Sequence, residues 1–244
     1  MLVGYPLKSY ITTVKLENIT ILPDVPRVRD DKRRYDDACG TAHALELIGE
    51  RWTLLVLREL MLGPRRFSEL RADLPGISAN VLTQRLAELE QRGLVRRRKL
   101  APPASVQVYE ATAWGLEAEP IVQALGRWAA RSPGHDPTLP ISGVSILLSF
   151  RTMISAKRAK GVDARFGFRF GADDYVARIK KGAIKVARGD IGPCDVVFSG
   201  PPAALAAVVY GGQPIDLIGV SGDRALAEKF TTLFVLPPKV GAGG

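Results

Sequence analysis

The chain has 244 residues, with 34 Lys or Arg against 25 Asp or Glu, and a formal net charge of +9 at pH 7. This length suffices for two domain-sized cores, and the basic balance favours an anionic partner, although nucleic acids and membrane surfaces attract the same charge. The 2 cysteines are too few for a disulfide framework or a zinc site, and neither a secretion signal nor an apolar run of about eighteen residues is present. We therefore expect a cytoplasmic protein that spans no membrane and holds no metal or cofactor.

Residues 1–34 precede the first predicted domain. They alternate apolar and polar side chains weakly and end in a mixed-charge cluster at residues 27–34. Such a cluster could add phosphate contacts as a basic arm, but a solvated linker is the commoner explanation for mixed charges. Both interpretations stay open at this point.

Cys39 lies just ahead of a helix predicted over residues 41–48. A thiol at a helix N-terminus can have a lowered pKa, which makes it more reactive. Cys39 is therefore a candidate redox sensor. The alternative is a small residue that packs at the start of a helix.

An apolar stripe at helical spacing is the strongest local pattern in the chain. Leu82, Leu86 and Leu89 recur at intervals of four and three residues. This stripe predicts a helix over residues 78–92, with one apolar and one polar face. Ser78 suits the N-cap of that helix.

A turn and a shorter helix precede this predicted helix, and a hairpin follows it. Residues 68–73 form the short helix, and Pro75 and Gly76 supply the sharp turn. Residues 94–99 resemble a strand that ends in a run of Arg and Lys, and residues 106–110 return as its partner. Helix, turn, helix and basic hairpin in this order are typical of proteins that place one helix in a DNA groove.

The polar face of the helix over residues 78–92 predicts contacts with bases, because helix-turn-helix proteins read base edges near the N-terminus of their second helix. Asn and Gln pair with adenine, and Arg pairs with guanine or phosphate. A solvated surface is the alternative, but the cationic run directly after the motif favours double-stranded DNA as the partner. The candidate DNA-binding residues are Ser78, Asn80, Thr83, Gln84 and Arg85 on the helix, Arg66 ahead of the motif, and Arg97, Arg98 and Lys99 in the hairpin.

Residues 39–131 resemble the HxlR-type winged helix-turn-helix transcriptional regulators of bacteria and archaea. The likeness lies in LELIGERWTLLVLRELMLGPRRFSEL, LPGISANVLTQRLAELEQRGLV and VYEATAWG. It implies a homodimer on a palindromic operator, with a dimer interface formed by the first and last helices, here residues 41–48 and 115–131. Some members of the family sense oxidants through a cysteine at the position of Cys39. The hairpin departs from the family pattern at residues 102–109, so the contacts of the wing are not carried over.

A composition break follows, because residues 131–140 concentrate three prolines and a glycine. Such a segment indicates a domain boundary. The predicted organisation is a DNA-binding domain over residues 35–132, a linker over 133–140, a second domain over 141–238 and a flexible tail over 239–244.

The second domain is predicted to be α+β. Phe166, Phe168 and Phe170 alternate with Gly167 and Arg169, which is the pattern of a strand with an aromatic inner face. Further strands are predicted over residues 175–180, 183–187 and 195–199, and helices over residues 144–159, 201–210 and 224–234.

This order of elements, with FSGPPAALAAVVYGG and IGVSGDRALAEKFTTLF, resembles sterol-carrier-protein-like domains. The resemblance implies a sheet covered by helices around an apolar cavity that binds lipids or other hydrophobic small molecules. The alternatives are a dimerisation module or a closed core without ligand, because apolar residues at strand and helix spacing are usually buried. The candidate ligand-binding residues are Phe168, Phe170, Phe198, Leu205 and Val209.

The expected function is that of a dimeric DNA-binding transcriptional regulator, whose winged helix is modulated by a hydrophobic ligand in the second domain. An enzyme is not expected, since the sequence has no nucleophile elbow, phosphate-binding glycine loop or metal-spaced His and Cys cluster. Asp173 and Asp174 are adjacent, so within a strand they would point to opposite faces. The alternatives are a lipid carrier or a ligand-metabolising enzyme with incidental DNA affinity.

Overall fold

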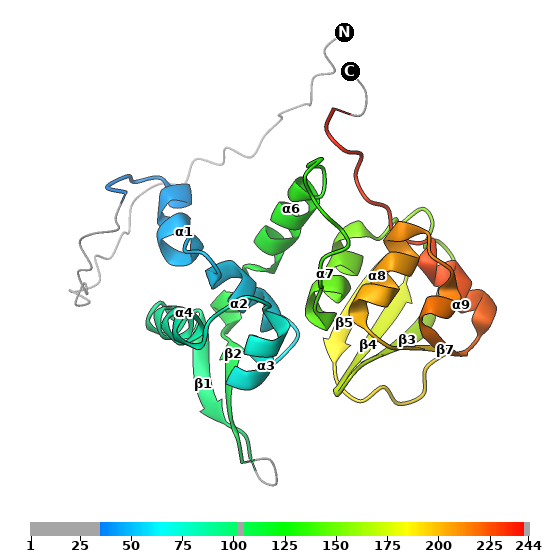
Figure 1. Cartoon of the computed structure of the whole chain (residues 1–244), viewed down its shortest axis with the longest axis horizontal. Coiled ribbons are helices and arrows are strands. Elements are labelled where there is room, and N and C mark those ends of the chain that lie inside the picture. Colours follow the sequence, from blue (N-terminus) through cyan, green and yellow to red (C-terminus); the bar gives the residue numbers. More distant parts are fainter. Residues whose placement is uncertain (1–34, 102–104, 242–244) are drawn as a thin grey trace, which may run out of the picture.

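A computed structural model describes residues 35–101 and 105–241 (Figure 1). Three segments lie outside the described residues: the N-terminal extension at residues 1–34, which is interpreted as a basic arm or a solvated linker, residues 102–104 in the hairpin, and residues 242–244 of the predicted tail. The N-terminal half is mostly helical with one hairpin, and the C-terminal half is a sheet with helices on one face. In the described parts of the chain, no helix is long and apolar enough to cross a membrane.

The N-terminal half is a winged helix-turn-helix. Its hairpin strands pair antiparallel, and Arg65 adds a short third strand through two backbone hydrogen bonds with Tyr109, at 2.9 and 2.8 Å. The elements are α1 (Gly40–Ile48), α2 (Thr53–Glu59), α3 (Phe67–Asp73), α4 (Ala79–Gln91), β1 (Val95–Lys99), β2 (Gln107–Ala111), α5 (Ala113–Leu116) and α6 (Glu119–Ala129).

The helix predicted over residues 78–92 is confirmed as α4. Ser78 is its N-cap, and the Ser78 hydroxyl accepts a hydrogen bond from the Val81 N–H at 3.2 Å. The predicted apolar stripe is fully buried and packs toward α2. Gly93 follows the helix with φ of +72°, a conformation that glycine adopts without strain.

The prediction of one helix over residues 115–131 is wrong. The chain instead forms α5 and α6, with a break at Glu117 and Ala118. Pro120 explains the break, since proline has no N–H to donate and its ring clashes with the carbonyl one turn earlier. Proline is tolerated in the first turn of a helix, which is where Pro120 lies in α6.

The C-terminal half contains a five-stranded sheet in the order β5-β4-β3-β6-β7. Strand β3 pairs parallel with β6, and the other neighbours are antiparallel. Helices α7, α8 and α9 cover one face, where the predicted aromatic side of β3 is buried (Figure 1). The elements are α7 (Gly143–Met153), β3 (Ala164–Phe170), β4 (Asp173–Lys180), β5 (Ala183–Arg188), β6 (Val196–Ser199), α8 (Pro202–Gly211), the 3-10 helix η1 (Ile215–Leu217), β7 (Gly219–Gly222) and α9 (Arg224–Thr231).

The helix predicted over residues 144–159 ends earlier, at Met153. Beyond this point the backbone pairs with the C-terminal segment: Ile154 forms a β-bridge with Phe234, and the Ser155 N–H donates to the Leu233 carbonyl at 2.8 Å. These distant partners carry no local signal, so the helical pattern alone overestimates the length of α7.

The two halves pack against each other through α7, which contacts α2 and α6 on one side and the sheet on the other. Arg151 on α7 donates to the Glu119 carboxylate on α6 at 2.6 Å. The buried apolar residues of both halves form one continuous cluster. The segment between α6 and α7, which contains the predicted linker, has no helix or strand.

Candidate nucleic-acid interface

The exposed face of α4 presents a short polar surface beside the hairpin. Asn80, Thr83 and Gln84 are all exposed there. The Thr83 hydroxyl donates to the Ala79 carbonyl at 2.9 Å, and the Gln84 amide donates to the Glu88 carboxylate at 3.1 Å. These contacts stay on the surface of α4, so the side chains remain accessible to a base edge.

The prediction that Arg85 lies on this exposed face is wrong. Its side chain is 7% exposed and forms ion pairs with Glu50 at 3.2 Å and Glu88 at 2.9 Å. Arg85 follows Leu82 by three residues and precedes Leu89 by four, so it lies on the same side of the helix as the buried stripe. Arg85 holds α4 against the turn before α2, and we no longer assign it to base reading.

The cations of β1 are partly compensated by carboxylates. Arg96 and Arg98 both pair with Glu110 on β2, and Arg97 pairs with Glu90 on α4 at 2.8 Å. Burial alone would raise the pKa of Glu110, but the hydrogen bonds from Arg98 and Arg96 outweigh burial and lower this pKa. The guanidinium groups are therefore held in place along the hairpin, where a phosphate would compete with the carboxylates for them.

Two other predicted phosphate ligands lie at the ends of this surface. Lys99 is exposed at the end of β1. Arg66 is exposed at the N-cap position of α3, and its backbone N–H donates to the Glu69 carboxylate at 2.8 Å. Both side chains can reach solvent, and their contact with DNA stays a prediction.

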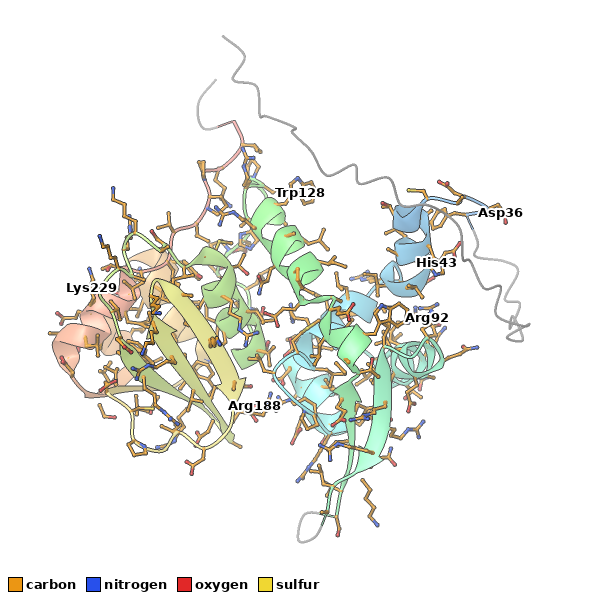
Figure 2. All side chains as sticks on the ribbon, turned by 180° about the vertical axis from the view of Figure 1, so that it is seen from behind. Asp36, His43, Arg92, Trp128, Arg188 and Lys229 are labelled. Atoms are coloured by element: carbon orange, nitrogen blue, oxygen red, sulfur yellow. The ribbon has the colours of Figure 1, made fainter. Side chains whose placement is uncertain are left out.

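Helix α6 carries an apolar stripe that faces solvent. Ile121, Leu125 and Trp128 recur at helical spacing, with Leu125 45% and Trp128 74% exposed, and Figure 2 shows Trp128 projecting from the outer end of α6. Leu45 on α1 is also exposed. Exposed apolar side chains that gather on one helix face are a feature of surfaces that contact other molecules.

The helix-turn-helix region of this chain is similar to a known family of proteins. Residues 47–136 match the HxlR-like helix-turn-helix family. Over 87 residues the chain is 38% identical to the uncharacterized HTH-type transcriptional regulator YvaP of Bacillus subtilis, an alignment that covers 35% of this chain and 80% of YvaP. This chain belongs to the HxlR-like helix-turn-helix family.

YodB is a second protein to which this chain is similar. The HTH-type transcriptional regulator YodB of Bacillus subtilis is 37% identical over 86 residues, which is 35% of this chain and 77% of YodB. Among solved structures, the reduced form of YodB matches 41% of this chain and 100% of that chain at 33% identity, with a TM-score of 0.36. The family match ends at residue 136, so the C-terminal half lies outside it.

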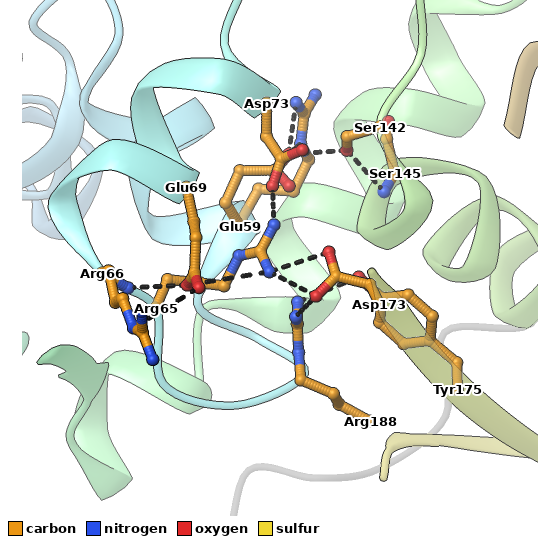
Figure 3. Close-up of polar contacts among 11 residues, drawn as sticks. Glu59, Arg65, Arg66, Glu69, Asp73, Ser142, Ser145, Asp173, Tyr175 and Arg188 are labelled. Atoms are coloured by element: carbon orange, nitrogen blue, oxygen red, sulfur yellow. Dashed lines mark hydrogen bonds and ion pairs between the residues drawn. The ribbon is translucent and has the colours of Figure 1, made fainter. Parts of the chain in front are cut away.

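Arg65 connects the HxlR-like region to the C-terminal sheet (Figure 3). Its guanidinium, 3% exposed, pairs with Asp73 on α3 and donates to both carboxylate oxygens of Asp173 on β4 at 2.8 Å. Arg188 on β5 also donates to Asp173, at 2.6 Å. Burial alone would lower the pKa of Arg65, but the hydrogen bonds and charges of Asp73 and Asp173 outweigh burial and raise it.

Glu59 makes a second polar connection between the halves. It is fully buried on α2, where it pairs with Arg58 at 2.6 Å and accepts a hydrogen bond from the Ser142 hydroxyl at 2.9 Å. The same hydroxyl caps α7 by accepting from the Ser145 N–H at 3.0 Å. Burial raises the pKa of Glu59, and Arg58 opposes part of that effect.

Four of the predicted ligand-binding residues belong to the packed interior of the C-terminal half. Phe168, Phe198 and Leu205 are fully buried, and Val209 is partly buried against them. The rings of Phe168 and Phe198 stack at 5.7 Å between centroids, and the Phe230 ring lies 5.1 Å from that of Phe198. These residues fill a core in which aromatic rings pack on one another, and we no longer assign them to a ligand.

Phe170, the fifth predicted ligand residue, lines a cleft between the two halves. The cleft has a volume of about 560 Å³. Its walls come from the end of α3 and the following turn, the start of α7, the β3–β4 turn and the β6–α8 turn: Ala72, Asp73, Pro75, Pro140, Ile141, Ser142, Gly143, Phe170, Gly171, Asp173, Gly200, Pro201 and Pro202.

The two cysteines are expected to differ in reactivity toward iodoacetamide near neutral pH. Cys39 is exposed at the N-cap of α1, and the backbone N–H groups of Thr41 and then Ala42 at the start of this helix lower the pKa of its thiol. Cys194 is half-buried and donates to the Ile191 carbonyl at 3.2 Å. Mass spectrometry of a labelling time course should find Cys39 modified first, and Cys39→Ser should lack the fast phase. Equal labelling rates would remove Cys39 as a candidate sensor.

Proposed function

We propose that this chain is a transcriptional regulator that binds double-stranded DNA as a homodimer, with α4 in the major groove. The observation that carries the proposal is the exposed pair Asn80 and Gln84 on α4 beside a cationic hairpin, within an HxlR-like region. Amide side chains read base edges, and the hairpin cations contact phosphates and fix the register. As a DNA-binding protein of this kind, it acts in the cytoplasm and carries no catalytic activity.

The dimer is proposed to form through the apolar stripe of α6 together with α1. Ile121, Leu125 and Trp128 supply the stripe of α6, and Leu45 is an exposed apolar side chain on α1. A two-fold dimer uses the same surface on both copies, so its DNA site has two-fold symmetry. The operator is therefore proposed to be a palindrome whose half-sites lie about one helical turn, or a multiple of it, apart.

The C-terminal half, residues 141–238, is proposed to be a sterol-carrier-like domain with its own boundary after the linker. The sheet with α7, α8 and α9 on one face supports this assignment. The filled aromatic core does not support a lipid carrier, the second candidate function, since the predicted cavity residues pack on one another. Binding to vesicles of anionic lipid without sequence preference on DNA would favour the carrier instead.

The experiment that tests this function is recovery of fragmented genomic DNA by the purified protein at near-physiological salt, followed by sequencing. Enrichment of a few sites with two-fold symmetric half-sites is expected. Uniform recovery across the genome would mean that the protein binds DNA only through sequence-independent contacts with phosphates. That result would contradict the proposal that it is a transcriptional regulator. Lys99→Ala should weaken binding to every sequence alike, because a phosphate contact carries no sequence information.

Asn80→Ala is expected to weaken binding to the recovered site by about 1–3 kcal/mol, the value of one good base contact. Binding to a scrambled duplex of the same length should change little. Fluorescence anisotropy with both duplexes measures the difference. If the variant bound the recovered site as tightly as the parent chain, Asn80 would not read a base.

A further inference from the structure

The cleft between the two halves has the size and lining of a small-molecule site. Its volume of about 560 Å³ lies in the range of roughly 300–1,000 Å³ that is common for ligand pockets. Six of its thirteen lining residues have larger apolar side chains, and one of these is aromatic: Pro75, Pro140, Ile141, Phe170, Pro201 and Pro202. Such a wall favours a flat ring system over a flexible chain, because a rigid ligand loses less conformational entropy on binding.

The polar groups of the cleft determine which ring system fits. Asp73 and Asp173 both line it, and each carboxylate is already oriented, by Arg65 in both cases and by Arg188 at Asp173 (Figure 3). A carboxylate accepts several hydrogen bonds, so each can accept one more from a ligand. A ligand without a donor, whether a neutral ether or an anionic carboxylate, would desolvate these oxygens with no compensation.

We propose that this cleft is the effector site of the regulator and that it binds an uncharged ring compound bearing a hydroxyl group. Ala72, Asp73 and Pro75 lie in α3 and the turn that leads to Ser78, the N-cap of α4, whereas the opposite wall belongs to the C-terminal half. A molecule in the cleft contacts both halves, so it shifts any equilibrium between arrangements of α4 by its differential affinity for them. Binding of the ligand in the cleft does not depend on the proposed DNA-binding function. The role of the ligand as an effector rests on that function.

Equilibrium dialysis of the full chain against beta-naphthol tests the ligand chemistry. Its methyl ether keeps the ring but lacks the donor, and naphthoate carries a negative charge. Saturable binding of beta-naphthol is expected, with both comparison compounds about tenfold weaker. Absence of saturable binding, or equal binding of the methyl ether or naphthoate, would overturn the proposed ligand class.

Tryptophan substitutions at two exposed alanines test where the ligand binds. Ala72→Trp places a large side chain in the cleft from α3, whereas Ala225→Trp makes the same change on the surface of α9, outside the cleft. Ala72→Trp is expected to weaken beta-naphthol binding about tenfold and Ala225→Trp to leave it unchanged, with the circular dichroism of both variants like that of the parent. Equal binding by both variants would place the ligand elsewhere and overturn the assignment of the cleft.

The effector role is tested with the duplex recovered from genomic DNA. Saturating beta-naphthol should change the Kd of the parent chain for that duplex by about fivefold or more, and should leave the Kd of Ala72→Trp unchanged. An unchanged Kd in the parent would overturn the effector role while the binding result stands. If the parent recovers no specific duplex, the proposed function fails and the effector role fails with it, again without affecting the dialysis result.

Discussion

Arg65→Met is expected to lower the free energy of unfolding by about 3 kcal/mol, the loss typical when one partner of a buried ion pair is removed. The guanidinium of Arg65 is almost completely buried between Asp73 and Asp173, which lie on different halves of the molecule. Methionine fills much of the same volume but removes the guanidinium, so Asp73 loses this ion pair and Asp173 keeps only the one with Arg188. The weakened pairing of these two half-buried carboxylates, not lost packing, is the source of the expected effect.

Urea unfolding followed by circular dichroism measures this change, and Arg66→Met is the matched control. Arg66 is adjacent in sequence, but its side chain is 51% exposed, and its ion pair with the Glu69 carboxylate is long, at 3.7 Å. Exposed ion pairs of this kind contribute about 0–1 kcal/mol. A loss below about 1 kcal/mol for Arg65→Met would mean that water replaces the guanidinium at both carboxylates.

The HxlR-like region could be predicted well because its signals are local. The apolar stripe of Leu82, Leu86 and Leu89 lies within two turns of one helix, and Ser78 caps that same helix. Pro120 was also a local signal, because it indicates the break between α5 and α6. The family resemblance implied one longer helix over residues 115–131, so this signal was not used. Burial of Arg85 follows from the same helical spacing, which places it beside the stripe.

The contacts between the halves could not be predicted in this way. Arg65 and Asp173 are 108 residues apart, and neither belongs to a motif with a chemical signature. Glu59 gave a weak signal, as a carboxylate inside the apolar run of α2, but its partner Ser142 lies beyond the linker. Long-range pairing depends on how α7 packs on α2, and no periodicity in the sequence encodes that packing.

The cleft is another feature that the spacing of residues in the sequence could not predict. Phe168 and Phe170 have the same strand periodicity and point to the same face of β3, yet the first lies in the core and the second at the cleft. Spacing predicts which face a side chain occupies. It does not predict whether another ring or empty space lies opposite. Strand β7 is a related case, because its short Gly219–Gly222 segment has too few apolar residues to show alternation.

Leu125→Glu is expected to dissociate the proposed dimer and to weaken binding to the recovered site by about a hundredfold. Leu125 lies in the middle of the exposed stripe of α6, between Ile121 and Trp128. A carboxylate there would be buried without a partner in the proposed interface, and its desolvation opposes association. Without the dimer, the second half-site binds as a separate event, so the gain of roughly 10²–10⁴ from linked binding is lost.

Analytical ultracentrifugation measures the oligomeric state, and Leu217→Glu is the matched control. Leu217 is an equally exposed leucine in the C-terminal half, 52% against 45% for Leu125. If only Leu125→Glu is monomeric, the stripe of α6 is the interface. If Leu217→Glu dissociates the dimer and Leu125→Glu does not, the C-terminal half is the dimerisation module. The exposed apolar stripe of α6 would then be expected to contact another partner.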